Sequence, residues 1–283
     1  MNTSELLNKW KQEEEKAKII GWDFSYIEGK FNSDEDSLPW NYEAVIKRYM
    51  YDNHRILDID TGGGEFLLSL EHPYQLTSAT DGYPPNVVLC RKKLGSLGID
   101  FHEMSDYSKM PFANSSFDVV INRHGSYDAN EIYRILKPNG LFITQQVGED
   151  NDHELVEMLL PDCEKSFSGH NLKSQIELFE KAGFTILEQG EAYRPITFYA
   201  TAALVWFAKI IEWEFVDFSV DRCFAKLLEV EKEIAKNGSV CGNIHRFILL
   251  QRNNSMLKGA KNDIHKTNSK SNADSVCGTS WTD

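Results

Sequence analysis

From Arg55 onward, short apolar runs alternate with segments of helical periodicity. Strands are predicted at 55–60, 76–81, 99–103, 117–122 and 141–147. Helices are predicted between them at 62–70, 87–94 and 130–136. Because strands that alternate with helices form βαβ units, the pattern predicts an α/β fold with a parallel sheet.

The segments on either side of this region have a different pattern of apolar and polar residues. Residues 2–21 predict an amphipathic helix, and 1–54 form an N-terminal helix and lid segment before the main domain at 55–252. Further helices are predicted at 153–160, 172–182, 198–215 and 221–236, and strands at 184–188 and 246–250. Residues 193–240 therefore form a helical insertion before the last strand. Residues 253–283 hold few apolar side chains and predict a disordered tail.

The composition of the chain argues against several classes of partner. The chain has 283 residues and a formal net charge of −13, and a strong acidic excess argues against a nucleic-acid partner. The N-terminus runs into charged residues, and the most apolar stretch, Ile196–Ile211, is too short to cross a bilayer. We expect a cytoplasmic protein without a membrane partner. No His or Cys pair has metal-ligand spacing, so we expect no metal.

The strongest motif is Asp58-Ile59-Asp60-Thr61-Gly62-Gly63-Gly64, where a strand feeds a glycine turn and then a helix. Glycine lets the backbone approach a ligand closely, and the helix N-terminus offers free N–H groups. A carboxylate beside such a turn suits a ligand that carries an ammonium group. The alternative is a plain strand-to-helix turn with Asp58 as a local cap.

Two further acids follow the next strands. Asp81 ends the second strand, where a carboxylate can accept both ribose hydroxyls, or can cap the turn that begins at Gly82. Asp106 follows the third strand, where it can accept from an adenine amino group, or can belong to an ordinary polar loop.

Together with Glu131-Ile132-Tyr133-Arg134-Ile135-Leu136-Lys137-Pro138-Asn139-Gly140, these motifs resemble the class I S-adenosylmethionine-dependent methyltransferases. The resemblance implies a Rossmann-like seven-stranded sheet with a final antiparallel strand, helices on both faces and a helical lid. It also implies S-adenosyl-L-methionine as cofactor and S-adenosyl-L-homocysteine as product. The candidate cofactor-binding residues are Asp58, Asp60, Gly62, Gly63, Gly64, Asp81, Gly82, Asp106, Tyr107 and Arg123.

One position departs from the family pattern. Asp60 stands where the family has the first motif glycine, and its side chain crowds the turn and adds a carboxylate beside Asp58. From this crowding, an Asp60→Gly variant is expected to bind the cofactor at least as tightly. A non-catalytic relative that only binds the cofactor is therefore an alternative.

The acceptor side of the reaction is less defined. His124 follows the fourth strand and is the candidate general base, because a neutral imidazole takes a proton near neutral pH. Tyr26, Trp40 and Gln146 are candidate substrate contacts, although Gln145 and Gln146 can equally hydrogen-bond to nearby loops. We expect methyl transfer to an O or N nucleophile of a small molecule; RNA or protein acceptors are the alternative.

Overall fold

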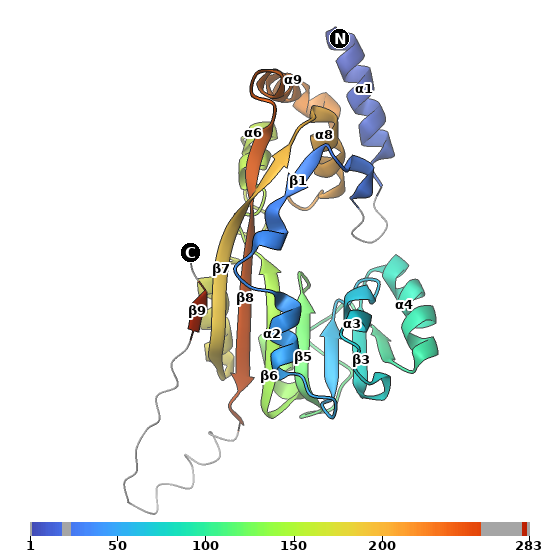
Figure 1. Ribbon diagram of the computed structural model, residues 1–283, viewed down its shortest axis with the longest axis vertical. Coiled ribbons are helices and arrows are strands. Elements are labelled where there is room, and N and C mark those ends of the chain that lie inside the picture. Colours follow the sequence, from blue (N-terminus) through green and yellow to red (C-terminus); the bar gives the residue numbers. More distant parts are fainter. Residues whose placement is uncertain (1, 19–23, 256–278, 282–283) are drawn as a thin grey trace, which may run out of the picture. The chain divides into compact units, whose positions relative to one another are not determined.

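The computed structural model describes residues 2–18, 24–255 and 279–281 (Figure 1). The chain divides into two compact units. We call residues 39–146, 171–191 and 247–283 the sheet unit, and residues 1–38, 147–170 and 192–246 the helical unit. The N-terminal helix and the predicted helical insertion fall in the helical unit, whereas residues 39–54 belong to the sheet unit.

The sheet unit confirms the predicted α/β fold. Its strands follow the order β7-β8-β6-β5-β2-β3-β4. Their bounds are β2 Ile56–Ile59, β3 Thr77–Asp81, β4 Asp100–Glu103, β5 Phe117–Arg123, β6 Leu136–Val147, β7 Phe184–Phe198 and β8 Val240–Asn253. The pairs β4–β3, β3–β2, β2–β5 and β5–β6 are parallel, and Figure 1 draws β8 running opposite to β6. These seven strands agree with the prediction, but the sheet formed by the described residues has nine, because β1 (Phe31–Ser33) and β9 (Thr279–Trp281) also pair with β7.

Helices connect these strands. They are α2 Tyr42–Tyr49, α3 Glu65–Ser69, α4 Pro84–Leu97, α5 Ala129–Ile135 and α7 Leu172–Ala182, with a 3₁₀ turn at Tyr74–Leu76. The Asp128 side chain caps α5 by accepting from the N–H groups of Asn130 and Glu131, and Gly98 ends α4 in the left-handed region. All four residues of β2 are buried, so the first strand of the glycine motif is anchored in the core.

The helical unit contains α1 Thr3–Lys16, β1 Phe31–Ser33, α6 His153–Leu159, α8 Thr201–Ile210 and α9 Val220–Asn237, with 3₁₀ turns at Ser25–Ile27 and Asp34–Ser37. Asn2 and Glu5 form a capping box that starts α1. Trp10, Trp206 and Phe215 are almost completely buried in one apolar cluster. The unit therefore has a hydrophobic core of its own.

Several boundaries differ from the predicted ones. The strand predicted at 184–188 extends to Phe198, so the following helix begins at Thr201 rather than at 198. Buried positions along β7 include the polar Glu188 and the small Gly190 and Ala192, which hid the strand pattern in the sequence. The first helix ends at Lys16, and the last strand begins at Val240.

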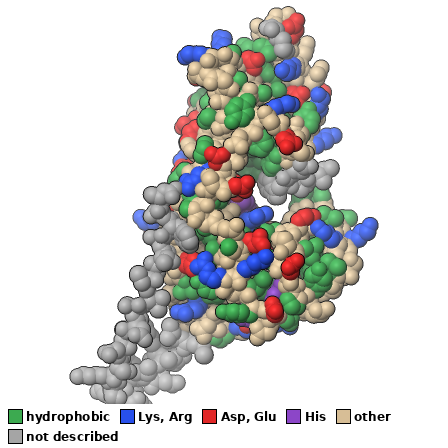
Figure 2. All heavy atoms as spheres, viewed as in Figure 1, with side chains coloured by type: hydrophobic (Ala, Val, Ile, Leu, Met, Phe, Trp, Pro, Cys, Tyr) green, Lys and Arg blue, Asp and Glu red, His purple; other side chains and the backbone are tan. Residues whose placement is uncertain are grey.

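The predicted tail lies mostly outside the described residues. Within it, β9 (Thr279–Trp281) pairs in parallel with β7, which differs from the predicted disorder for these three residues. Among the described residues, no helix has the length and apolar character needed to cross a membrane. Acidic and basic side chains are mixed across the face shown in Figure 2.

Candidate functional site

The glycine turn and Asp58 form the centre of the candidate site in the sheet unit. Asp58 is buried at the end of β2 and accepts a hydrogen bond of 2.7 Å from the Thr61 hydroxyl. Burial raises the pKa of the Asp58 carboxyl to about 7. Gly64 has a φ of 76°, and a Cβ there would lie 2.8 Å from Leu94 Cδ2, so the turn requires glycine at this position.

Asp81 joins the turn after β2 to the turn after β3. Its two carboxylate oxygens accept from the N–H groups of Gly62 and Tyr83, each at 2.8 Å. Gly82 is in direct contact with the backbone after β4, because a Cβ at this position would lie 2.4 Å from the Met104 carbonyl oxygen. The acid predicted to hold ribose hydroxyls therefore also orders the loops around it.

Asp60 connects two other loops. Tyr107 donates its hydroxyl hydrogen bond to one Asp60 oxygen, and the Ser126 N–H donates to the other at 2.9 Å. Asp60 has a φ of 55°, and burial raises the pKa of its carboxyl to about 6. A Cβ at Gly125 would lie 2.5 Å from Asp60 Cβ, so the glycine at 125 makes room for the acid at 60.

Asp106 lies in the exposed loop after β4. The Ser108 hydroxyl and N–H donate to one Asp106 oxygen at 2.6 and 3.0 Å, and they hold the pKa of this carboxyl below its usual value. The same loop is fixed further on by Arg134, which pairs with Glu131 at 2.7 Å and donates to the carbonyls of Met110 and Phe112. The E-x-x-R motif thus supports the loop that carries Asp106.

The end of β5 carries a buried amide network. Asn122 donates to the Ile59 carbonyl at 2.9 Å, and Gln146 donates to Asn122 Oδ1 at 2.5 Å and to Thr144 Oγ1 at 2.7 Å. Gln146 is therefore placed in hydrogen bonds between strands. Arg123 is exposed, with its guanidinium 4.6 Å from the centre of the Phe66 ring.

His124 follows directly, with a φ of 59°. Its N–H donates to the Gln145 carbonyl at 2.9 Å, and its Nε2 lies 3.3 Å from Gln145 Nε2. The other side of the Gln145 amide accepts from Trp40 Nε1 at 2.7 Å. The structure therefore brings the predicted base, His124, into one hydrogen-bonded chain with the predicted substrate contact Trp40.

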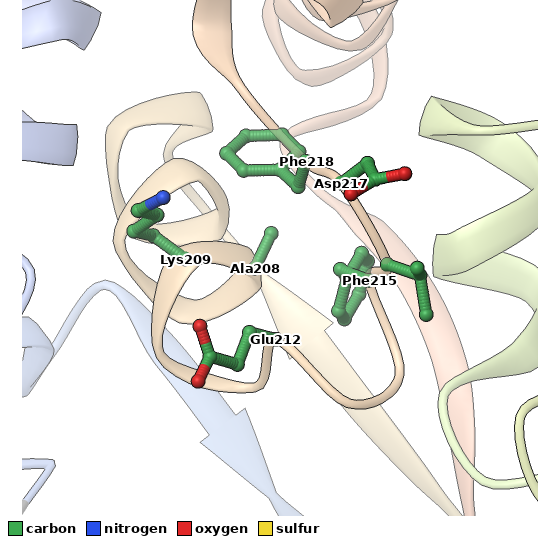
Figure 3. Close-up of a pocket in the computed structure, with 7 residues that line it drawn as sticks. Ala208, Lys209, Glu212, Phe215, Asp217 and Phe218 are labelled. Carbon is green, nitrogen blue, oxygen red and sulfur yellow. The ribbon is translucent and has the colours of Figure 1, made fainter.

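Tyr26 belongs to the helical unit. Its ring stacks on Trp206 at 5.6 Å, and its hydroxyl donates to Glu13 at 2.8 Å. The helical unit also holds a cavity of about 290 Å³, shown in Figure 3. The residues that line it are Ala208, Lys209, Glu212, Phe215, Val216, Asp217 and Phe218. None of the residues predicted from the sequence lines this cavity.

Two site residues escaped the sequence reasoning. Thr61 donates to Asp58, and its position three residues after this acid is the signal that was available. Tyr42 is buried, and its hydroxyl lies 2.9 Å from the Asn122 carbonyl and 3.2 Å from that of Ile143. Nothing in the sequence around Tyr42 marks it, because it reaches β5 and β6 from a separate helix.

The chain is similar in sequence to known methyltransferases. Residues 57–144 match the family model described as "Methyltransferase domain". The ubiquinone/menaquinone biosynthesis C-methyltransferase UbiE of Pasteurella multocida is 22% identical over 199 residues, which are 64% of this chain and 70% of that protein. The phthiotriol/phenolphthiotriol dimycocerosates methyltransferase of Mycobacterium leprae is 34% identical over 109 residues, which are 35% of this chain and 40% of that protein.

A solved structure shares the fold. It is the crystal structure of a protein from Bacillus halodurans that is named as a methyltransferase without proof of activity. The match has a TM-score of 0.53 and 16% sequence identity, and it covers 75% of this chain and 98% of that one. The chain is therefore similar to methyltransferases in two ways: residues 57–144 match the methyltransferase domain model, and the sheet shares its fold with this solved structure.

Proposed function

We propose that the chain transfers a methyl group from S-adenosylmethionine to a small-molecule acceptor. The observation that carries this proposal is the placement of Asp58, Asp60 and Asp81 around one glycine turn of the sheet unit. Ligands of parallel α/β sheets bind at the carboxyl ends of the strands, where this turn lies. The cofactor supplies an electrophilic methyl group on a positively charged sulfur.

The side chains present fit a ligand of this chemistry. Asp58 is buried without a salt bridge among the described residues, and the burial that raises its pKa to about 7 would be offset by a nearby cation. We assign Asp58 and Gly62–Gly64 to the methionine part, Asp81 to the ribose, and Asp106 with Tyr107 to the adenine. Gly62 has open space around its Cβ position, which allows a ligand to approach the backbone.

The paired contacts of Asp60 support binding rather than its loss. A carboxylate at this position was expected to crowd the turn, yet it accepts from Tyr107 and Ser126 and is accommodated by Gly125. We therefore favour an active enzyme over a relative that has lost turnover.

The acceptor is proposed from sequence and from the names of relatives. The sequence favours an O or N nucleophile of a small molecule. The relatives include proteins named as C-methyltransferases of ubiquinone/menaquinone biosynthesis and of sterols, which add a carbon nucleophile to these candidates. In each case the enzyme must align the nucleophile with the methyl group, and His124 is the titratable side chain after β5 at this edge.

Calorimetry with S-adenosylmethionine and S-adenosylhomocysteine tests the cofactor half of the proposal. We expect saturable binding of both by the full chain, weakened in Asp81→Asn. Radiolabelled methyl transfer to a panel of phenols, quinols, sterols and small amines then tests the acceptor half, with a structured RNA as the competing acceptor. Failure to bind either cofactor form would reject the proposal, and labelling of RNA alone would reject the small-molecule acceptor.

A further inference from the structure

We propose that Arg123 and Asp58 together hold the charged amino-acid end of the cofactor, with Arg123 binding the carboxylate and Asp58 the ammonium group. This inference rests on the proposed function and deepens it, since the sequence named Arg123 as a cofactor contact without assigning it a part of the cofactor. Both residues belong to the sheet unit. Asp58 lies in β2 and Arg123 is the last residue of β5, and these two strands are neighbours in the sheet.

The register of β2 and β5 places the two side chains on one face of the sheet, at the carboxyl ends of the strands. The strands are parallel, and Asp58 is opposite Ile121. Arg123 follows Ile121 by two positions, and residues two apart on a strand point to the same face. Asn122 fixes this register, because its side chain donates to the Ile59 carbonyl at 2.9 Å. Arg123 therefore lies on the same face as Asp58, nearer to the end of the strands.

The guanidinium of Arg123 is available to a ligand. Burial raises the pKa of the Asp58 carboxyl to about 7, and the charge of Arg123 acts on it in the opposite direction, so the two groups are near enough to interact. Within the described part of the chain, the Arg123 side chain has no ion pair and no hydrogen bond. Lys93, by contrast, is already used beside the turn, because it pairs with Glu65 at 2.6 Å and donates to the Gly63 carbonyl at 3.1 Å.

Two aromatic rings hold this guanidinium in place. Its central carbon lies 4.6 Å from the centre of the Phe66 ring, which is a cation–π contact. Phe66 belongs to α3, the helix that begins directly after the glycine turn, and its ring stacks on Tyr42 with 5.4 Å between the centres. Tyr42 is buried, and its hydroxyl donates to the Asn122 carbonyl at 2.9 Å. A guanidinium that rests on a ring keeps its N–H groups for a further partner.

The charges of this pair match those of an α-amino acid, whose ammonium and carboxylate groups are attached to the same carbon. Asp58, Asp60 and Asp81 surround the glycine turn, and acids alone would hold the ammonium group but repel the carboxylate. The carboxylate therefore needs a cation beside Asp58. Arg123 supplies this cation, and a guanidinium can bind a carboxylate through two parallel N–H···O hydrogen bonds.

Calorimetry of the full chain with three ligands tests this pairing. S-adenosylmethionine has both charged groups of the amino acid, its decarboxylated form keeps only the ammonium group, and 5′-methylthioadenosine lacks both. Arg123→Met should weaken binding of S-adenosylmethionine by about 10- to 30-fold, which is modest for a charge-assisted pair because Arg123 is exposed. The same variant should bind methylthioadenosine as the wild type does. It should bind the decarboxylated form at least as tightly, since Arg123 repels the ammonium group that this form retains.

Three further variants serve as controls. Arg123→Lys keeps the charge but loses the two parallel hydrogen bonds, so S-adenosylmethionine should bind about three- to fivefold more weakly. Phe66→Leu removes the ring under the guanidinium and should weaken S-adenosylmethionine alone, by about two- to fivefold. Arg55→Met removes the same charge from an exposed arginine of the sheet unit, directly before the first residue of β2, and should bind all three ligands as the wild type does.

The choice of ligands distinguishes the outcomes. S-adenosylmethionine and its decarboxylated form both carry the ammonium group, so a change that acts only through Asp58 would weaken the binding of both. Equal losses for these two ligands in Arg123→Met, or an unchanged affinity for S-adenosylmethionine, would overturn the inference and leave the proposed function standing. If the wild type binds none of the three ligands, the proposed function is rejected and the inference falls with it.

Discussion

Both units bury carboxyl groups, but in opposite surroundings. In the sheet unit, burial raises the pKa of Asp58 to about 7, and the acid stands beside a glycine turn. In the helical unit, burial raises the pKa values of Asp152 and Glu214 to about 7 as well. There, Asn151 donates to Asp152 at 2.9 Å and accepts from Arg246 at 2.6 Å.

The two groups of buried acids differ in whether the fold itself provides a cation for them, and this difference distinguishes a candidate binding site from a structural network. Arg246 lies on β8 and also pairs with Glu35, at 3.1 Å, so the helical unit supplies its own cation from within the fold. Asp58 has no ion pair among the described residues: the charge of the exposed Arg123 lowers its pKa but does not cancel the effect of burial, and the backbone nearby is open at Gly62. A buried acid therefore indicates a ligand site only where the protein leaves its charge unmatched next to accessible backbone.

The largest effect is expected from removing the internal cation. Arg246→Met removes the ion pair with Glu35 and the cation near the buried Asp152 and Glu214. Because the Glu35 side chain is 39% exposed, we expect the free energy of unfolding to fall by about 2–4 kcal/mol, less than for a fully buried pair. Urea denaturation measures this loss. Cofactor affinity of the folded fraction should stay unchanged.

Arg222→Met is the matched control, because the Arg222 side chain in the same unit is half exposed. Its effect should stay within about 0.5 kcal/mol. A loss below about 1 kcal/mol in Arg246→Met would show that the helical unit's carboxyl groups do not depend on this cation.

The next effect concerns cofactor affinity. Asp81→Ala removes charge-assisted hydrogen bonds and should weaken binding by about 1.5–3 kcal/mol, or roughly 10- to 150-fold, in calorimetry. Asp52→Ala, an exposed acid of the same unit, should bind as the wild type does. Unchanged affinity in Asp81→Ala would remove the ribose role from Asp81.

The two units also differ in what the sequence revealed. The sheet unit was predictable because β-branched runs, the glycine turn and Asp58, Asp81 and Asp106 are local signals. The helical unit was not, since Arg246 and Glu35 meet across more than two hundred residues of chain. The same limit hid the link from Trp40 to Gln145, and β7 was underestimated because polar and small residues occupy its buried positions.

A pH titration sharpens the comparison further. The raised pKa of Asp58 means that the folded chain holds a proton that the unfolded chain has released, so this acid lowers stability as pH rises from about 4 to about 7. A cationic ligand prefers the carboxylate and must displace that proton. Cofactor affinity should therefore rise with pH, by about tenfold between pH 6 and pH 8, and level off above.

Calorimetry between pH 6 and pH 8 shows which unit causes the pH dependence of cofactor affinity. Asp58→Asn should make affinity independent of pH, whereas Asp152→Asn should leave the pH dependence of affinity intact and reduce only that of stability. If cofactor affinity still depends on pH in Asp58→Asn, another titratable group of the sheet unit is responsible for that dependence.

The smallest effect, and the most direct test of how the sheet unit differs from its family pattern, concerns Asp60. The sequence alone predicts that Asp60→Gly binds the cofactor at least as well, because bulk and charge are removed. The structure predicts the reverse, since Asp60 accepts from Tyr107 and from the Ser126 N–H and thereby orders the loops after β4 and β5. Glycine adopts the φ of 55° at this position without strain, which offsets part of this loss. We therefore expect Asp60→Gly to weaken cofactor binding by about 0.5–1.5 kcal/mol.

A double-mutant cycle with Tyr107→Phe isolates the contact. If the carboxylate and the hydroxyl act together, the double variant should bind the cofactor about as weakly as either single variant, because the second change removes a hydrogen bond that is already broken. Asp60→Asn, which keeps the shape and can still accept from Ser126, should lie between the wild type and Asp60→Gly. Strictly additive losses, or tighter binding by Asp60→Gly, would mean that the acid at position 60 only crowds the turn and that the loops are ordered without it.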